Sequence, residues 1–242
     1  MRLRWLVVLL AALAALLLLI SGPGARLGLW RFGTGFSLMR WGAYVGIAAG
    51  LLAVALLLLP ARGGPRLTGP LVAAVILGGI AAFVPWRWLR VARSVPPIHD
   101  ITTDTAQPPE FVAVLPLRAS APNPAAYGGE EIAAQQHQAY PDIRPLELSA
   151  PPGAAFDRAL AAARAAGWDV VATDSAAGRI EATATTGWFG FKDDVVVRVR
   201  PDSGGSRVDV RSVSRVGKSD VGTNARRIRQ YLGRLAGSKS AA

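Results

Sequence analysis

The sequence predicts an α+β protein in which three transmembrane helices precede a two-layer β-α-β-β-β-β-α sandwich, an antiparallel sheet with helices on one face. Three apolar runs, each of about 18–19 residues, stand near the N-terminus and match the length that crosses a bilayer core. The same part contains no acidic residue. Later residues alternate between apolar and polar over short runs and include two amphipathic segments, which is typical of a packed α+β domain.

The charge is divided unevenly along the chain. Ten of the +11 formal charges come from arginines in residues 1–94, so the later part is almost neutral. A nucleic-acid-binding domain needs a basic stripe on its folded surface, and this balance argues against that partner. The chain has no cysteine and only two histidines, His99 and His137. These counts exclude a disulfide and a cysteine-ligated metal, and we expect neither a metal nor a cofactor.

Residues 1–93 form the predicted membrane domain, with helices at about residues 3–20, 41–59 and 71–89. The first run follows two arginines, as a secretory signal also does. Its length and the lack of a small-x-small site after Ile20 favour an uncleaved helix. The loop 22–40 mixes apolar residues with arginines, which predicts a segment lying along the lipid headgroups. A short loop, 60–70, carries two further arginines.

Glycine recurs at every fourth position of the second predicted helix, as Gly42, Gly46 and Gly50. Such spacing removes side chains from one face and allows another helix to approach closely. The partner could be the first or third helix of this chain, or a second copy in a homo-oligomer.

Residues 94–144 are interpreted as a proline-rich connector. Seven prolines between residues 94 and 124 preclude a long helix. We expect a polar tether with an edge strand at Phe111–Leu115, which Pro116 ends, and a short helix at Glu130–Gln138.

The predicted soluble domain spans residues 145–237. We expect strands at 146–149, 168–173, 179–185, 195–199 and 206–216, and helices at 153–166 and 221–236. The alternation places Val170 opposite Ala182, Ala172 opposite Ile180, and Arg198 opposite Asp209.

Three blocks of sequence carry a resemblance to a known family. They are "PPIHDITTDTAQPPEFVAVLPLR" (96–118), "IEATATTGWFGFKDDVVVRVRP" (180–201) and "SRVDVRSVSRVGKSDVGTNARRIRQYL" (206–232). Together they resemble the domain of unknown function 1499 family over residues 94–236, in a form with N-terminal membrane helices. The resemblance implies a domain of the cell envelope or membrane and carries over no catalytic residue. The sandwich is also similar to helix-grip folds, in which a curved sheet wraps a helix.

The orientation in the membrane depends on the arginines beside the helices. With the N-terminus inside, six arginines lie outside and four inside, so the count favours a cytoplasmic C-terminal domain. The first helix usually sets orientation, however, and its arginines precede it. With the resemblance added, we expect a bacterial inner-membrane protein whose domain lies on the outer, periplasmic side; a cytoplasmic domain is the alternative.

The segment Val216–Ser219 ends like a phosphate-binding loop, but Ser212 stands where that motif needs a glycine. A weaker anion site could form from Arg215, Lys218 and the amides that begin the last helix, with Asn224, Arg226 and Arg227 one turn on. The favoured alternative is that Asp220 or Ser219 caps this helix.

Catalytic candidates are few. Asp193 and Asp194 are adjacent in a strand, so they point to opposite faces and cannot share one substrate. His99 with Asp100 or Asp104 could perform the acid–base chemistry of a membrane-tethered hydrolase, provided that the connector is held in place.

Two surfaces could bind a partner. Trp188, Phe189 and Phe191 form either a lip for a lipid or small apolar ligand, or a corner whose rings fold onto the core, which is the commoner arrangement. The outward face of the sheet is predicted to be solvated; otherwise it would suit an anionic headgroup or an acidic protein. Its arginines include Arg198, Arg200, Arg211 and Arg215, with Lys218 nearby.

No complete catalytic constellation is present, so the first hypothesis is an integral membrane protein with a non-enzymatic binding or assembly domain. Its partners would be the bilayer and an envelope protein or lipid. The hydrolase and a helix-grip-like domain that binds an apolar ligand are the alternatives. A transporter fares worst, because the three apolar runs carry no ionisable residue at mid-membrane.

Overall fold

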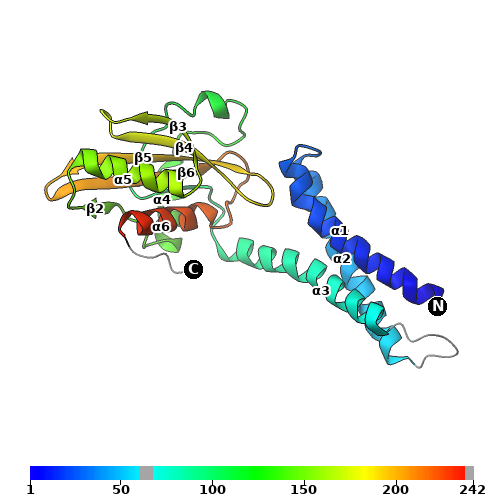
Figure 1. Ribbon diagram of the computed structural model, residues 1–242. Helices are drawn as coiled ribbons and strands as arrows, with labels where there is room; N and C mark the ends of the chain where they lie inside the picture. Colours follow the sequence, from blue (N-terminus) through cyan, green and yellow to red (C-terminus); the bar gives the residue numbers. More distant parts are fainter. Residues whose placement is uncertain (60–67, 238–242) are drawn as a thin grey trace. The chain divides into compact units, whose positions relative to one another are not determined.

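The computed structural model describes residues 1–59 and 68–237 (Figure 1). The chain divides into two compact units. The first contains Met1–Val91 together with Gly187–Gly190, and the second contains Ala92–Thr186 and the chain from Phe191 onward. Each unit is described by itself.

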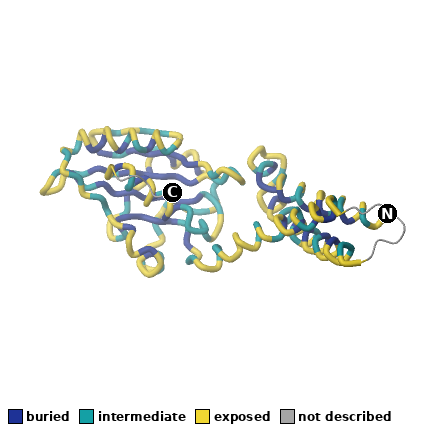
Figure 2. The backbone as a smooth tube through the Cα atoms, turned by 60° about the horizontal axis from the view of Figure 1, so that its bottom comes forward, coloured by how far each residue is buried: buried dark blue, intermediate teal, exposed yellow. Residues whose placement is uncertain are grey.

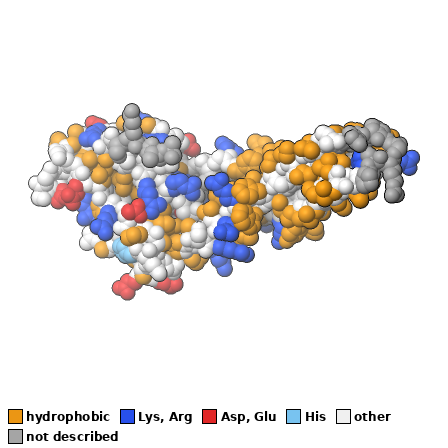
Figure 3. All heavy atoms as spheres, turned by 90° about the horizontal axis from the view of Figure 1, so that it is seen from below, with side chains coloured by type: hydrophobic (Ala, Val, Ile, Leu, Met, Phe, Trp, Pro, Cys, Tyr) orange, Lys and Arg blue, Asp and Glu red, His pale blue; other side chains and the backbone are white. Residues whose placement is uncertain are grey.

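The first unit consists of three helices, α1 (Arg2–Arg26), α2 (Phe32–Leu58) and α3 (Thr68–Ser94). All three are long and apolar enough to cross a membrane, as the sequence predicts. Hydrophobic side chains make up much of the face of these helices that Figure 3 shows. Small and branched side chains meet where the helices pack together. The buried cluster consists of Val7, Ala11, Ala49, Ala53, Leu71 and Ala74.

The predicted headgroup segment at 22–40 is wrong, because both neighbouring helices extend into it. α1 continues to Arg26 and α2 begins at Phe32. Gly28 adopts a φ of +74°, and Leu29 donates its N–H to the carbonyl of Gly24 at 2.9 Å. A glycine in this conformation ends a helix at little cost, so the connection needs only residues 27–31. The other predicted loop, 60–70, lies largely outside the described residues.

The glycine series in α2 packs against this chain's own helices. A Cβ on Gly42 would lie 3.0 Å from the carbonyl oxygen of Ala14 in α1, and one on Gly46 would lie 2.8 Å from that of Gly78 in α3. At Gly50 a Cβ would meet nothing within 4 Å. A Cβ on Gly78 would lie 3.2 Å from the backbone nitrogen of Gly50, so α3 also approaches α2 closely there. Homo-oligomerisation through α2 stays a prediction.

The second unit is built on an antiparallel sheet of six strands, which confirms the predicted α+β class. The spatial order is β1-β6-β5-β4-β3, and β2 pairs with β6 beside β1. The strands are β1 (Asp100–Thr102), β2 (Leu146–Leu148), β3 (Asp169–Asp174), β4 (Arg179–Thr185), β5 (Lys192–Asp202) and β6 (Gly205–Ser214). The helices are η1 (Pro116–Arg118), α4 (Gly129–Ala139), α5 (Pro152–Ala165) and α6 (Thr223–Leu235).

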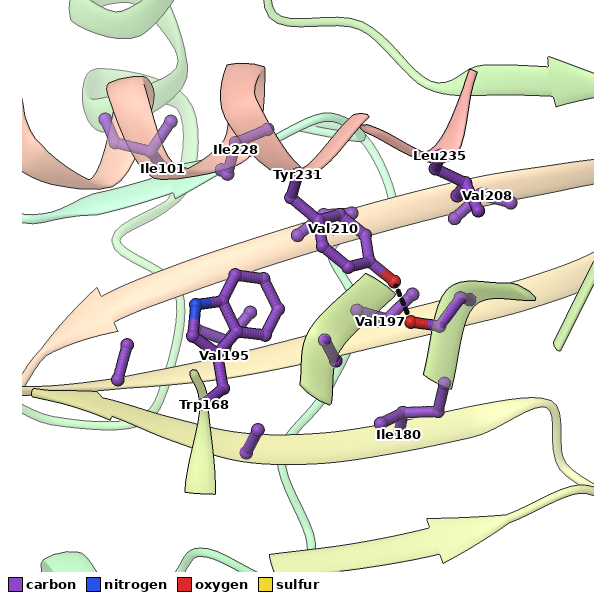
Figure 4. Packing of buried hydrophobic residues seen from close by; sticks show 14 of the residues in the cluster. Ile101, Trp168, Ile180, Val195, Val197, Val208, Val210, Ile228, Tyr231 and Leu235 are labelled. Carbon is purple, nitrogen blue, oxygen red and sulfur yellow. Dashed lines mark hydrogen bonds between the residues drawn. The ribbon is translucent and has the colours of Figure 1, made fainter. Parts of the chain in front are cut away.

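The hydrophobic core lies between one face of this sheet and the helices α5 and α6. Figure 2 shows the strands as the most buried part of the unit. The rings of Trp168 and Tyr231 stack with centroids 4.8 Å apart, and the Tyr231 hydroxyl donates to the carbonyl of Ala159 at 2.8 Å (Figure 4). Burial raises the pKa of Tyr231 far above its ordinary value. Both rings belong to the buried cluster between the sheet and the two helices.

The strand registers agree with the alternation except at one position. Val170 pairs with Ala182, and Arg198 pairs with Asp209, as predicted. Ala172, expected opposite Ile180, pairs with Glu181 because β3 contains a bulge between residues 170 and 172. The extra residue, Val171, packs against a cluster on the opposite face of the sheet. A simple hairpin register cannot include it.

The connector is packed against the sheet, so the predicted tether is wrong. Its start forms the edge strand β1, and α4 follows close to the predicted bounds. No strand forms at Phe111–Leu115, where the chain turns into η1. The buried Gln136 of α4 accepts the N–H of Thr102 at 2.9 Å and donates to its carbonyl at 2.6 Å. A side chain therefore completes the hydrogen bonding of β1.

We predict that Gly78→Ala destabilises the packing of α3 on α2, because the new Cβ would lie 2.4 Å from the carbonyl oxygen of Gly46. Overpacking of this kind costs about 1–3 kcal/mol. The measurement is unfolding of the full chain in mild detergent with increasing SDS. Gly79→Ala is the matched control, because its Cβ would meet nothing within 4 Å. Equal transitions for the two variants would contradict the packing.

Candidate functional site

The face of the sheet that points away from α5 and α6 carries a layer of charged side chains, here called the arginine–carboxylate layer. It was expected to be solvated. Residues 103–127 of the connector cover it instead, through Phe111 and Val114, which pack on Val196 and Val213. The layer consists of Arg179, Glu181, Asp194, Arg198, Arg200, Arg207, Asp209, Arg211 and Arg215, with Asp100, Asp104 and Arg118 from the connector.

Glu181 is fully buried and fixes the turn at Val112–Val114. Its carboxylate accepts the backbone N–H groups of Val112, Ala113 and Val114, each at 3.0 Å. The guanidinium Nε of Arg179 lies 3.1 Å from the same carboxylate. Three successive N–H groups can point at one anion only if the chain turns, which explains why the predicted strand at Phe111–Leu115 does not form.

Asp194 is also fully buried and joins a connector arginine to a strand arginine. Its carboxylate lies 2.7 Å from Nη1 of Arg118 and 2.8 Å from Nη2 of Arg215. The hydroxyl of Thr183 donates to it at 2.8 Å. Burial lowers the pKa of Arg118, and Asp194 opposes that effect.

Asp100 and Arg211 form a buried bidentate pair, with N–O distances of 3.0 and 2.7 Å. The guanidinium carbon of Arg211 lies 5.2 Å from the ring centroid of Phe111 and 5.4 Å from that of Tyr127. Burial raises the pKa of Tyr127 to about 12, and the Asp100 carboxylate adds to that effect. Within the described residues the Tyr127 hydroxyl has no hydrogen-bond partner. These contacts make Arg211 a centre of packing between the connector and β6.

The remaining part of the layer joins Asp104 of the connector to Asp209 of β6 through three arginines. Arg198, Arg200 and Arg207 each contact both carboxylates, at N–O distances from 2.9 to 3.4 Å. Their guanidiniums are partly exposed, so this is the most accessible part of the layer. A surface recess of about 510 Å³ adjoins it, between the connector and the residues Arg179 and Arg198.

The three residues of the hydrolase hypothesis do not converge on one point. Asp100 is engaged by Arg211, whereas Asp104 is engaged by Arg198, Arg200 and Arg207. The Nδ1 of His99 lies 3.4 Å from the carbonyl oxygen of Lys218. The arrangement holds these side chains in place in separate interactions. Over residues 1–59 and 68–237, no group of three or more potential metal ligands occurs.

The start of α6 is capped by its own sequence, as the favoured alternative predicts. Asp220 accepts the N–H groups of Gly222 and Asn224 at 3.0 and 2.5 Å. Ser219 accepts the N–H of Val221 at 3.1 Å. Burial raises the pKa of Asp220 above its ordinary value. The weaker anion site does not form here, because carboxylate and hydroxyl oxygens occupy these amides.

Val221 itself lies outside α6, with a φ of +54°, so the helix begins two residues later than predicted. Asp193 and Asp194 face opposite sides of the sheet, as expected: Asp193 pairs with Arg227 of α6 at 2.5 Å, and Asp194 lies in the arginine–carboxylate layer. Arg215 is likewise in that layer, whereas Lys218 is exposed.

The aromatic cluster does not fold onto the domain core. Trp188 is 45% exposed, and none of Trp188, Phe189 and Phe191 belongs to the buried cluster between sheet and helices. Gly187–Gly190, which includes the first two rings, belongs to the first unit. The favoured expectation of a corner packed on the core is therefore wrong, and the lip stays a prediction.

A second recess, here called the basic recess, lies along α6 and has a volume of about 300 Å³. Three arginines of α6 line it, and its other residues include no carboxylate. Arg227 is held by Asp193, whereas Arg226 and Arg234 are exposed and form no ion pair within the described part of the chain. The lining consists of Ala166, Gly167, Trp168, Ala184, Thr185, Thr223, Arg226, Arg227, Gln230, Tyr231 and Arg234.

Sequence reasoning assigned Arg226 and Arg227 to an anion site at the start of α6 and missed the recess further along the helix. The sequence does indicate a basic helix surface here, because Thr223–Leu235 contains four arginines and no acidic residue. Strand ends far away in the sequence complete the recess, so periodicity alone could not place it.

A family model described as protein of unknown function (DUF1499) matches residues 100–235. This range begins at the first residue of β1 and ends at the last residue of α6, so it includes the connector that covers the sheet. No curated protein matches the chain.

We predict that Glu181→Gln detaches the connector. The amide replaces one acceptor oxygen with a donor that faces backbone N–H groups, and Arg179 loses its buried partner. Breaking such a site costs about 3 kcal/mol or more. Denaturant unfolding and proteolysis within residues 103–127 measure the effect. The exposed Glu147, changed to Gln, is the control and should alter stability by less than about 0.5 kcal/mol. Equal stability of both variants would contradict the role of Glu181.

Proposed function

The chain belongs to the DUF1499 family, and from that premise we propose that it is a membrane-anchored, non-enzymatic protein whose α+β domain binds a ligand or partner through the basic recess. One observation carries the proposal. The candidate carboxylates Asp100, Asp104 and Asp194 are engaged in the arginine–carboxylate layer. Arg226 and Arg234 of α6, in contrast, have no ion-pair partner among the described residues.

The layer favours a structural role for its carboxylates. Asp194 and Asp209 are fully buried, and every interaction described for them is with an arginine, a hydroxyl or neighbouring strands. A general acid or base must instead reach a substrate proton. The basic recess differs from this layer in exposure and in pairing. It is open to solvent, and two of its arginines have no ion-pair partner among the described residues.

The anchor supports a function at the membrane. Only residues 95–99 separate the end of α3 from β1. Five residues reach at most about 18 Å. This short covalent link tethers the domain to a helix that is apolar enough to span the bilayer.

We propose further that the domain lies on the outer side of a bacterial inner membrane, because the arginines at the start of the first helix favour an inner N-terminus and three spans then deliver the domain outside. A reporter active only outside the cytoplasm, fused after Ala242, is expected to be active. An inactive but well-expressed fusion, together with an active cytoplasmic reporter at the same position, would reverse the orientation.

The binding function is tested by photo-crosslinking in native membranes. A photoreactive amino acid at Gln230, which is exposed in the basic recess, is expected to give a specific adduct with a protein or lipid. The same residue at the exposed Gln138 of α4 is the control. The double variant Arg226→Gln/Arg234→Gln should reduce the adduct from position 230. Equal labelling from both positions, or none from 230, would contradict the proposal.

A further inference from the structure

We propose that the basic recess binds the phosphate group of an anionic phospholipid headgroup. The proposal rests on the proposed function and names the ligand class of the same recess.

The charges favour an anion. Arg226 and Arg234 are exposed and have no ion-pair partner among residues 1–59 and 68–237, and none of the lining residues is acidic. Arg227 also lines the recess, and its guanidinium is fixed by Asp193 at 2.5 Å and by the hydroxyl of Ser212 at 3.0 Å. Asp193 neutralises one of the three arginines, so the recess keeps an excess of positive charge. Arginine presents a planar fork of donors that matches phosphate oxygens.

The spacing places these groups on one surface. Thr223, Arg226, Arg227, Gln230 and Arg234 follow one another at intervals of one, three or four residues, so they lie along one face of the helix. Arg226 and Arg234 are eight positions apart, which corresponds to about 12 Å of helix. Two flexible arginine side chains can close over a group that lies between them.

The floor and volume suit a headgroup. Trp168 and Tyr231, which stack at 4.8 Å, form an apolar floor, and Thr185 and Thr223 add hydroxyl groups. A volume of about 300 Å³ is at the small end of ligand sites, and a peptide segment would need more room.

The anchor selects the lipid as the source of the phosphate. Because the chain carries three helices apolar enough to span a bilayer, the domain is tethered to a membrane and shares its surroundings with lipid headgroups. Basic side chains near an anionic leaflet each contribute about 1 kcal/mol of attraction. A soluble phosphate compound lacks this advantage of local concentration.

The test uses the purified full chain in a neutral detergent, titrated with short-chain phosphatidylglycerol and followed by calorimetry. Short-chain phosphatidylcholine is the zwitterionic comparison. We expect phosphatidylglycerol to bind at least tenfold more tightly, and Arg226→Gln/Arg234→Gln to lose that preference. Arg144→Gln is the matched control, because Arg144 is an exposed arginine that does not line the recess. It should bind like the unchanged chain.

If the double variant unfolds at the same temperature as the unchanged chain, it is folded and its binding result counts. If the double variant does not fold, the single variant Arg234→Gln is tested in its place. Equal binding of the two lipids, or an equal loss in Arg144→Gln, would overturn the proposal. Inorganic phosphate that binds as tightly as phosphatidylglycerol would show a free-anion site, and tighter binding of hexaglutamate would show an acidic protein partner. Either result also overturns the lipid proposal. A photo-adduct at position 230 would then still support the broader binding function.

Discussion

Pairing of buried charges between the connector and the sheet is the constraint on which this domain depends. Glu181 holds three peptide groups of the connector, and Asp194 and Arg211 each bind a connector side chain of opposite charge. Removing one member of such a pair leaves the other charged and dehydrated, which is costly. The connector is therefore as much a part of the folded domain as the strands are, and this explains why the family match begins at β1.

Most helices and strands could be predicted from the sequence, because the period of the apolar residues and the length of the apolar runs indicate the type of element. Alternation identified β4 and the partner of Arg198, and apolar run length identified the three membrane helices. The cover over the sheet could not be predicted in this way. An arginine that faces water and an arginine that faces a buried aspartate give the same alternation in a strand. The bulge at Val171 shifts the facing of the later residues of β3 by one position, but the apolar residues Trp168, Val170 and Ala172 still alternate in the sequence and do not reveal it. The helix-ending conformation of Gly28 likewise leaves no mark on the neighbouring apolar pattern.

The candidate site was harder to predict than the fold, since its members come from separated parts of the chain. The arginines of α6 are visible in the sequence, but the recess also needs Trp168 and the end of β4. The residues that first suggested chemistry, Asp100 and Asp104, prove to be structural partners of arginines. In this domain the buried carboxylates of the sheet are paired with arginines, whereas Arg226 and Arg234 are exposed and have no ion-pair partner among the described residues.

The side-chain amide of Gln136 also affects whether a second copy of the protein can add a strand at the β1 edge of the sheet. An uncovered outer strand is a template on which another chain can add a strand, and proteins confined to a membrane meet one another often. Gln136 occupies the donor and acceptor of Thr102 at that border and leaves neither for a visiting chain. At Thr102, a glutamine on a short helix thus takes the hydrogen bonds that an added strand would use.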